Sequence, residues 1–247
     1  MPIKRAHMAT FPAREHILEA SLRSMEKQVD EIHLVLNEYS SVPGFLSGIR
    51  NLNPILPKED LKDIGKFAAA PGPDDLVFLV DDDLCYSSSY CDWLMDRAAG
   101  LGLETAVFGL HGSIYRRRDV EHADDRKHLH YRRGLRRSLF VDQLGTGTVF
   151  ASGRHVPPLD YMLGSQRFAD VRYAKWCYEN GVDQVALARP FGMIRPLRHR
   201  TGKIYRDFTA TSPEPVLAEI RTFAGRSSRV GEAVGERIGL KDLLLGA

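Results

Sequence analysis

Three adjacent aspartates, Asp81, Asp82 and Asp83, are the residues of this chain whose type and spacing most clearly suggest chemistry. Neighbouring carboxylates repel one another, so a triplet of this kind is tolerated most easily beside a cation or an array of hydrogen-bond donors. Carboxylate oxygens are hard ligands of the kind that suit Mg²⁺ and Mn²⁺. The triplet therefore suggests a divalent metal site; the simpler alternative is an acidic, solvated turn that precedes a helix.

The residues just before the aspartates predict a buried β-strand. Leu76 to Val80 is an unbroken apolar run, too short for a helix and rich in β-branched and aromatic side chains. Strands that are covered on both faces, as in a parallel α/β sheet, have this composition. In open α/β sheets the ligand lies beyond the carboxyl ends of the strands, which is where the three aspartates would be.

Strand and helix patterns alternate along much of the chain. The periodicity predicts strands over 3–10, 31–37, 76–80, 105–110 and 182–188, with short strand-like segments over 139–152. It predicts helices over 15–29, 58–67, 90–101, 168–180 and 215–224, and a last helix from about 230 to 245. Residues 38–58 and 195–208 are expected to be irregular. This order predicts an α/β fold with a central, mostly parallel sheet flanked by helices and with further helices at the C-terminal end.

The bulk composition is that of an ordinary globular chain. It has 247 residues, 43% of them hydrophobic, and a net charge of +2, which suits one large domain or a domain with an appendage. No secretory signal is evident, and no apolar run approaches the roughly 20 residues of a membrane span. The three cysteines are an odd number without metal-site spacing, so we expect reduced thiols and a cytoplasmic protein.

Glycine-rich phosphate loops are missing from the sequence. Neither G-x-G-x-x-G after the first strand nor G-x-x-x-x-G-K occurs, which argues against a dinucleotide-binding Rossmann site and a P-loop kinase. A nucleotide diphosphate would then have to be held in another way, and a metal bound by the aspartate triplet is one such way.

Four segments, in this order, resemble bacterial glycosyltransferases of the GT-A fold, of the family 2-like kind with a D-x-D motif. They are Thr10-Phe11-Pro12-Ala13-Arg14, the strand with its aspartates over 76–83, Gly145-Thr146-Gly147, and Ala169-Asp170-Val171 at a helix start. The resemblance implies a GT-A-like catalytic domain over 1–208, with a nucleotide-binding part (1–110) and an acceptor-binding part (111–208), followed by a C-terminal helical extension over 209–247. One departure is that a single acid, Asp170, stands where the family usually has an acidic pair.

The resemblance also implies roles for individual residues. Asp83 would bind a divalent metal (Mn²⁺ or Mg²⁺) directly, and His199 would supply a further ligand. Asp81 would contact the metal through water or the nucleotide ribose. Asp82 would face the donor sugar or nucleotide, and Asp170 would be the base of an inverting transfer; the simpler alternative for Asp170 is an acid that the helix dipole favours. The remaining nucleotide contacts implied are Thr10, Pro12, Arg14 and Lys66.

The segment 113–137 is more basic than this resemblance leads one to expect. It contains nine basic residues against four acidic ones. It could be a solvated loop, or it could bind an anionic lipid-linked glycan acceptor or the anionic surface of a membrane. Nucleic acid is not expected as a partner, because the net charge is low and no aromatic–basic binding motif accompanies the arginines.

The sequence thus predicts a metal-dependent, hexosyltransferase-like enzyme. It would transfer a sugar from a nucleotide-sugar donor, UDP-linked by preference, to a glycan or lipid-linked acceptor in surface polysaccharide biosynthesis, in the cytoplasm or at the inner face of the membrane. Two alternatives remain open. One is a metal-dependent nucleotidyltransferase or phosphohydrolase; the other is a non-enzymatic module that binds an anionic ligand or a membrane surface.

Overall fold

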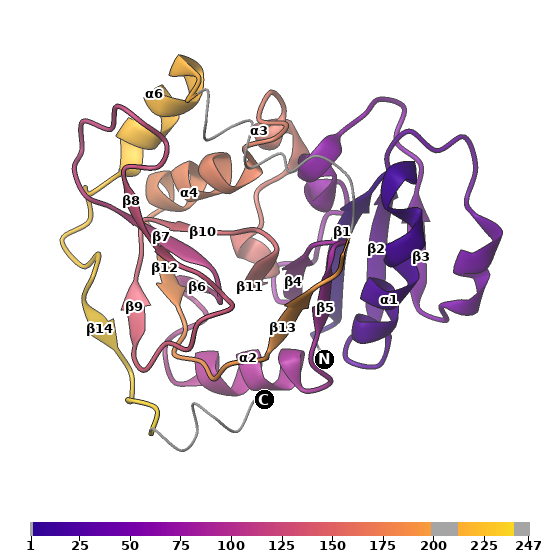
Figure 1. Ribbon diagram of the computed structural model, residues 1–247, viewed down its shortest axis with the longest axis horizontal. Helices are drawn as coiled ribbons and strands as arrows, with labels where there is room; N and C mark the ends of the chain where they lie inside the picture. Colours follow the sequence, from indigo (N-terminus) through magenta and orange to yellow (C-terminus); the bar gives the residue numbers. More distant parts are fainter. Residues whose placement is uncertain (1, 199–211, 240–247) are drawn as a thin grey trace.

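A nine-stranded mixed sheet forms the centre of the computed structural model, which describes residues 2–198 and 212–239 (Figure 1). The strands lie in the order β14-β9-β12-β6-β11-β4-β1-β2-β3. Only β9 and β11 are antiparallel to both of their neighbours, so the other seven strands run in one direction. The predicted α/β class with a mostly parallel sheet is therefore confirmed. The strands are β1 (Lys4–Thr10), β2 (Glu31–Leu36), β3 (Leu52–Ile55), β4 (Leu76–Val80), β6 (Ala106–Gly109), β9 (Ser138–Phe140), β11 (Thr148–Ser152), β12 (Asp183–Ala186) and β14 (Ala233–Val234).

Helices cover both faces of this sheet (Figure 1). On one face, α1 (Glu15–Glu26) and α2 (Tyr90–Ala99) bury their apolar sides in one hydrophobic cluster. On the other, the 3₁₀ helix η3 (Lys62–Phe67), α3 (Leu159–Met162) and α4 (Ala169–Glu179) form a second cluster. Strand β4 contributes to both: Phe78 and Val80 belong to the first cluster, Val77 and Leu79 to the second. This alternation explains why the apolar run before the aspartates is continuous.

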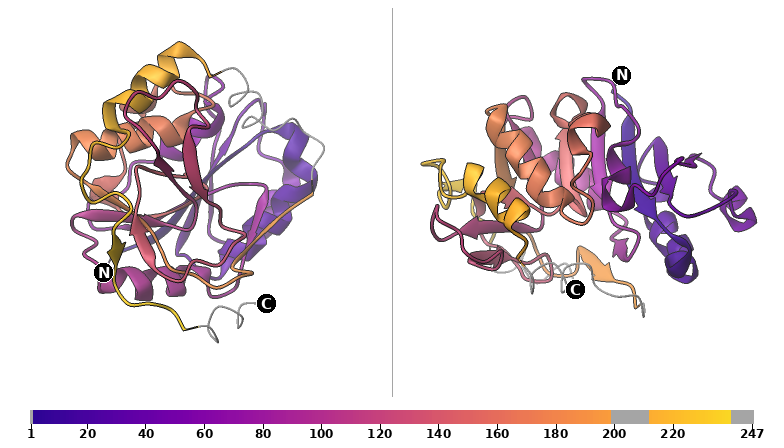
Figure 2. Two further views of the ribbon diagram at one scale, coloured as in Figure 1. Left: turned by 60° about the vertical axis from the view of Figure 1, so that its left-hand side comes forward. Right: turned by 90° about the horizontal axis from the view of Figure 1, so that it is seen from above.

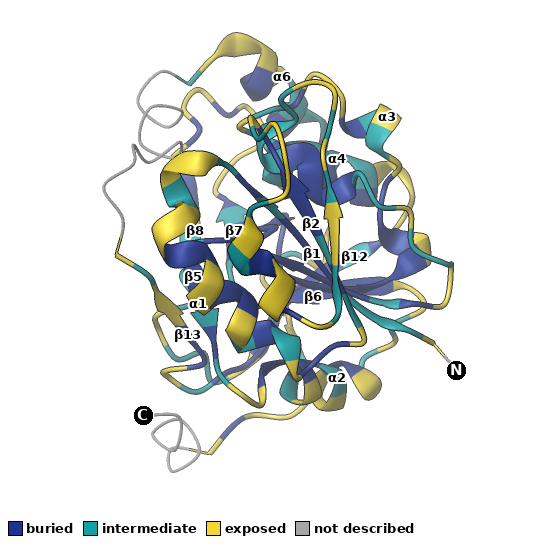
Figure 3. Cartoon of the chain, turned by 90° about the vertical axis from the view of Figure 1, so that its right-hand side faces the viewer, coloured by how far each residue is buried: buried dark blue, intermediate teal, exposed yellow. Residues whose placement is uncertain are grey.

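Helix α1 shows how the sequence pattern produces this layering. Its buried residues recur at helical spacing, and Figure 3 shows its inner side buried and its outer side exposed. Pro12 begins the short 3₁₀ helix η1 (Pro12–Arg14), because its fixed φ suits the first position of a helix. The turn from β1 into α1 therefore comes directly after Thr10.

The chain reverses its direction of travel across the sheet between β1 and β4. It proceeds from β1 to β2 and β3 on one side, and then returns to β4 on the other side of β1. Such a reversal, the topological switch point, opens a crevice at the carboxyl ends of the two strands, where ligands of open α/β sheets bind. The carboxyl ends of β1 and β4 carry Thr10 and the triplet that begins at Asp81.

The reversed direction of β11 brings a third chain segment to the same edge. Thr148, the first residue of β11, is paired with Val80, the last residue of β4. The stretch 145–147 therefore lies beside the aspartates. Helix α4 leads into β12, which is parallel to β6, so the amino end of α4 lies at this edge as well.

Smaller elements complete the described chain. Strands β10 (Gln143–Leu144), β7 (Gly112–Tyr115) and β8 (Arg126–Leu129) form a three-stranded sheet, and β5 (Leu84–Tyr86) pairs with β13 (Ile194–Pro196). Helix α6 (Glu214–Phe223) packs against α4 and the loop around Val120 in a third cluster (Figure 2). The remaining 3₁₀ helices are η2 (Gly44–Gly48) and η4 (Gly153–His155).

Several expected elements differ from the structure. The helix predicted from residue 230 is wrong for residues 230–239, where β14 instead pairs with β9 and extends the main sheet. The stretch 38–58 contains the edge strand β3, and only Lys62–Phe67 of the helix predicted over 58–67 is helical, as a 3₁₀ helix. Within the basic segment 113–137, residues 113–115 belong to β7 and residues 126–129 form β8, which pairs with it antiparallel; the rest of the segment lies outside these strands.

A buried carboxylate, Asp142, connects the small sheet to the end of α6. It accepts hydrogen bonds from the backbone N–H groups of Tyr115 and Gly225, each at 2.8 Å. Burial raises the pKa of Asp142 from 3.8 to about 6, although these two hydrogen bonds oppose the shift. The protonated form is therefore favoured in the folded chain, and the stability that Asp142 contributes is lost as the pH rises through about 6.

A pH series of the Asp142→Asn variant tests this assignment. The free energy of unfolding of the wild type, relative to that of the variant, is expected to fall by about 2 kcal/mol between pH 4 and pH 7, since each pKa unit corresponds to about 1.4 kcal/mol. Urea denaturation at several pH values measures the difference. The exposed Asp119→Asn variant is the control and should show a constant difference. A pH-independent difference for Asp142→Asn would contradict the assignment.

No helix within the described part of the chain is long and apolar enough to cross a membrane. All three cysteines are free thiols, as expected.

Candidate active site

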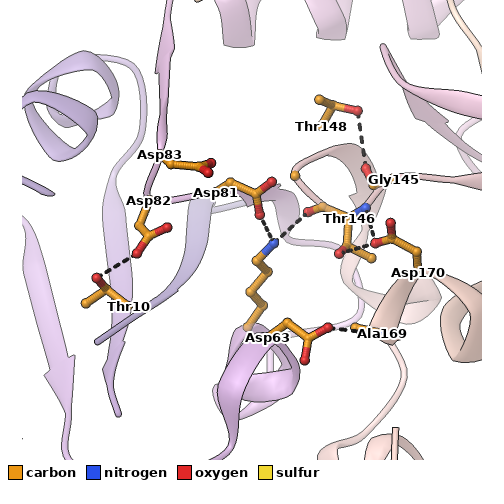
Figure 4. A network of polar contacts seen from close by, with 12 residues as sticks. Thr10, Asp63, Asp81, Asp82, Asp83, Gly145, Thr146, Thr148, Ala169 and Asp170 are labelled. Atoms are coloured by element: carbon orange, nitrogen blue, oxygen red, sulfur yellow. Dashed lines mark hydrogen bonds and ion pairs between the residues drawn. The ribbon is translucent and has the colours of Figure 1, made fainter. Parts of the chain in front are cut away.

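The three aspartates that follow β4 make different contacts at the carboxyl edge of the sheet (Figure 4). Asp82 is the most buried, with 5% of its surface exposed. Its Oδ2 accepts a hydrogen bond of 2.7 Å from the hydroxyl of Thr10. The contact follows from the parallel register of β1 and β4: His7 is paired with Leu79, so three residues further on Thr10 lies opposite Asp82.

Arg14 is the first cation of the site. From η1, its guanidinium reaches Oδ1 of Asp82 at 2.5 Å and Oδ2 of Asp83 at 2.9 Å. Burial raises the pKa of Asp82 to about 6, and Arg14 and Thr10 limit that rise. Burial alone would lower the pKa of Arg14, but Asp82 and Asp83 raise it, so the guanidinium stays charged. Arg14 thus neutralises part of the charge of the triplet.

Lys66 is the second cation and joins the two halves of the site. Its Nζ forms an ion pair with Asp81 and donates a hydrogen bond of 3.4 Å to the carbonyl oxygen of Thr146. The Lys66 side chain is only 4% exposed. Burial would lower its pKa, but Asp81 raises it above the ordinary value, so a charged ammonium lies between β4 and the 145–147 stretch.

The backbone beside Asp81 is fixed by Tyr86. The Tyr86 hydroxyl accepts a hydrogen bond from the N–H of Asp81 at 2.7 Å and donates one to the carbonyl oxygen of Gly147 at 2.8 Å. Gly147 approaches Asp81 so closely that a Cβ there would lie 2.0 Å from the Asp81 carboxylate. The position therefore requires glycine if Asp81 is to keep its orientation.

Asp170 lies in the first turn of α4 (Figure 4). It is separated from the aspartate triplet by the Lys66–Thr146 bridge, in which Lys66 contacts both Asp81 and the carbonyl oxygen of Thr146. Oδ1 of Asp170 accepts hydrogen bonds from both the N–H and the hydroxyl of Thr146, at 2.8 and 2.6 Å. These two donors fix the orientation of the carboxyl group. Within residues 2–198 and 212–239, no hydrogen bond involves the second oxygen, Oδ2.

A further acid, Asp63, holds the beginning of α4 in place. Its carboxylate accepts hydrogen bonds from the backbone N–H groups of Arg167 (2.5 Å) and Ala169 (3.2 Å). Burial raises the pKa of Asp63, and these hydrogen bonds oppose the rise. Asp63 and Lys66 both belong to η3, so this one short helix positions Asp81, Thr146 and the amino end of α4 together.

Acids outnumber bases in this group of residues. Two cations, Lys66 and Arg14, lie among five carboxylates, which leaves a net charge of −3 when all are ionised; the carboxylates are Asp63, Asp81, Asp82, Asp83 and Asp170. Asp81 and Asp83 are the more exposed members of the triplet, with 38% and 24% of their side chains accessible. The excess negative charge favours a cation next to these two.

The side chains available as metal ligands limit the kind of cation site that can form here. Among the described residues, no three His, Cys, Asp or Glu side chains are arranged as a metal-binding group. A complete protein cage for a metal is therefore not present in that part of the chain. Mg²⁺ and similar ions are commonly held by one or two carboxylates, water and substrate phosphates, and Asp81 and Asp83 fit that arrangement.

The structure brings together most of the residues that the sequence singled out. These residues form two hydrogen-bonded groups that meet through the backbone of the triplet: Thr10 and Arg14 with Asp82 and Asp83, and Lys66 with Asp81, Thr146 and Asp170. Arg14 and Lys66, however, pair with the aspartates themselves. Pro12 starts η1 and lines a surface groove of about 520 Å³ with Glu15 and Glu19, whose charges disfavour a diphosphate there.

His199, the expected third metal ligand, lies outside the described residues. The segment that leads to it passes the triplet, since the N–H of Leu197 donates a 2.7 Å hydrogen bond to the carbonyl oxygen of Asp83.

Sequence reasoning missed the roles of Asp63, Tyr86 and Thr146. Thr146 belongs to the segment 145–147, which the sequence analysis did single out. Its hydroxyl could have suggested a hydrogen bond to an acidic side chain. Asp63 and Tyr86 act through partners distant in the chain or on the backbone, for which no local pattern exists.

The chain matches no protein-family model, and a search of curated proteins also found no match. The site must therefore be interpreted from its own geometry.

Proposed function

We propose that this protein is a metal-dependent glycosyltransferase that transfers a sugar from a nucleotide diphosphate sugar to a glycan or lipid-linked acceptor. The observation that carries the proposal is the position of Asp81–Asp83 and Asp170 on the two sides of the Lys66–Thr146 bridge, at the switch point of the sheet. The side with the aspartate triplet is suited to a leaving diphosphate. The side with Asp170 offers a carboxylate that can accept a proton.

The donor side has the groups that a diphosphate needs. Asp81 and Asp83 would hold the divalent ion, which when bound supplies positive charge to the departing diphosphate oxygens. Thr10 and Arg14 define the end of the crevice next to β1, where a nucleotide would lie. Lys66 orients Asp81 through their ion pair, and Gly147 leaves the space that this carboxylate requires.

The acceptor side centres on Asp170. In the proposed reaction an acceptor hydroxyl oxygen bonds to the anomeric carbon, the bond from that carbon to the diphosphate breaks, and Oδ2 of Asp170 takes the hydroxyl proton. The nucleoside diphosphate leaves with the bonding electrons. Direct displacement of this kind inverts the anomeric configuration. Thr146 holds Asp170 in place through Oδ1.

The proposal also covers the donor and the process that the enzyme serves. The donor is a UDP-sugar by preference, and the sugar is added during surface polysaccharide assembly on the cytoplasmic side of a membrane.

Calorimetric titration tests the donor side. We expect UDP and Mn²⁺ each to bind weakly alone and at least about tenfold more tightly together, because two carboxylates complete a metal shell only with phosphate oxygens. Asp83→Asn should abolish this cooperativity, whereas the exposed Asp96→Asn on α2 should not change it. If UDP, GDP and dTDP all fail to bind with Mn²⁺ or Mg²⁺ present, the proposal is wrong.

A further inference from the structure

The turn formed by residues 130–135, between β8 and β9, is hydrogen-bonded at both ends to Arg189. The Arg189 guanidinium is 1% exposed and donates hydrogen bonds to the carbonyl oxygens of Leu129 (3.0 Å) and His130 (2.9 Å). Its backbone exchanges two hydrogen bonds with Leu135. Burial lowers the pKa of Arg189 to about 10. Among the described residues no carboxylate pairs with it, so its buried charge serves to fix both ends of the turn.

Rings from this turn pack towards the acceptor side of the site. His130 and Tyr131 lie with their ring centres 4.4 Å apart, and both contact the ring of His111, at 5.0 and 5.9 Å. His111 in turn lies against Gly145, where a Cβ would be 3.1 Å from its ring. Gly145 precedes Thr146, the partner of Asp170. The turn is thus connected to the proposed base through His111 and Gly145, which pack together, and then through the hydrogen bonds of Thr146.

Tyr131 also lies within the electrostatic reach of the aspartate triplet. Burial raises the pKa of Tyr131; Arg132 opposes the rise, and the Asp83 and Asp81 carboxylates add to it. Burial lowers the pKa of His111 to about 3, and His130 and His128 contribute to this shift, so the His111 ring is neutral. His111, His130 and Tyr131 therefore form a cluster of neutral rings.

The basic segment divides into two parts with different surroundings. In its first part Arg117 lies 3.8 Å from both Glu121 and Asp125, and Arg118 bonds to the carbonyl oxygen of Gly225. The second part, 126–137, contains six basic residues and no acidic one. Within residues 2–198 and 212–239, no carboxylate pairs with Arg132 or Arg133, and both are exposed.

We infer that the 130–135 turn is the acceptor subsite and that it binds an acceptor carrying a pyrophosphate group. This inference rests on the proposed function. A sugar ring would lie against His130 and Tyr131, because aromatic faces suit the apolar side of a sugar. Arg132 and Arg133 would bind the pyrophosphate, since guanidinium groups match phosphate oxygens in pairs of hydrogen bonds.

Calorimetry with two probes tests the subsite. Inorganic pyrophosphate and geranyl pyrophosphate are titrated in EDTA, so that a metal-dependent donor site does not contribute. The Arg132→Gln/Arg133→Gln variant is expected to bind both probes at least about tenfold more weakly than the wild type. The Arg116→Gln/Arg117→Gln variant removes the same charge from the first part of the segment and should bind like the wild type. Tighter binding of geranyl pyrophosphate than of pyrophosphate identifies a lipid-linked acceptor, and equal binding identifies the pyrophosphate group as sufficient.

Other results separate this inference from the proposed function. Nucleotide binding with Mn²⁺, together with equal pyrophosphate affinity in all three proteins, overturns the subsite alone. Arg132- and Arg133-dependent pyrophosphate binding without any nucleotide binding overturns the glycosyltransferase proposal and, with it, the acceptor role of the turn. If the arginines are needed only for binding to phosphatidylglycerol vesicles, the turn contacts a membrane surface and the acceptor subsite is wrong.

Discussion

Replacing Asp170 by asparagine is expected to lower kcat for sugar transfer by about 10²- to 10⁴-fold, the usual contribution of a general base. The asparagine amide oxygen can still accept both hydrogen bonds from Thr146, so the position of the side chain is preserved. The amide nitrogen that replaces Oδ2 cannot take a proton at neutral pH. The loss is therefore expected in kcat, with the affinity for UDP and Mn²⁺ unchanged. Single-turnover kinetics with UDP-sugar and calorimetry of UDP binding measure the two quantities.

A matched control separates chemistry from helix stability. Asp160 lies in the first turn of α3 and is exposed, so Asp160→Asn changes the same chemical group at an equivalent helix position. An acid in a first helical turn contributes about 0.3–1 kcal/mol, and both variants should lose a similar amount of stability. Only Asp170→Asn should lose transfer. Turnover of Asp170→Asn within about threefold of the wild type would be too small a loss for a general base and would exclude that role.

Much of the site's location could be predicted from the sequence. The apolar run before Asp81 indicated a strand buried on both faces, and the alternation of elements indicated a mostly parallel sheet. In such a sheet the ligand lies beyond the carboxyl ends of the strands, so the triplet was expected at a ligand-binding edge, while Thr10 was indicated only by the resemblance. Asp170 was expected at a helix start, and α4 begins one residue before it. Local periodicity was sufficient for these features.

The contacts within the site could not be predicted, because they depend on pairings that are distant in the chain. Lys66 and Asp81 are 15 residues apart, Arg14 and Asp82 are 68 apart, and Thr146 and Asp170 are 24 apart. The 145–147 stretch reaches the site only because β11 is antiparallel to its neighbours, and no short pattern encodes strand direction. The helix expected from residue 230 failed for a related reason: residues 233–234 are recruited as a strand by the exposed edge of β9.

The second large effect is expected in stability, from Arg14→Met. Removing one partner of a buried ion pair typically costs about 3–5 kcal/mol, because the other charge is left uncompensated. Asp82 is buried and loses its cation in this variant, while Thr10 remains. We expect the free energy of unfolding to fall by about 3 kcal/mol at pH 7, as measured by urea denaturation, because protonation of Asp82 limits the loss. The exposed Arg137→Met should have little effect.

The pH dependence and a double variant identify the cause. Without Arg14 the pKa of Asp82 rises further. The stability of the variant then depends on the protonated form of Asp82, so it is retained near pH 4 and lost as the pH rises towards 7. The defect should therefore be small near pH 4 and largest near pH 7. Arg14→Met/Asp82→Asn should recover most of the loss, since the uncompensated charge is gone. A defect equal at both pH values and in the double variant would show that Arg14 stabilises the fold by packing on Phe11 instead.

This result bears on how the triplet is to be interpreted. Three adjacent carboxylates suggested a metal because they need compensation, but Arg14 and Lys66 already supply two positive charges from within the chain. The metal is supported instead by the negative charge that remains after those pairs form, next to the more exposed Asp81 and Asp83. If Arg14→Met loses stability as described but keeps cooperative binding of UDP and Mn²⁺, Asp82 and Arg14 hold the fold while Asp81 and Asp83 hold the ion. If both are lost together, the triplet works as one unit.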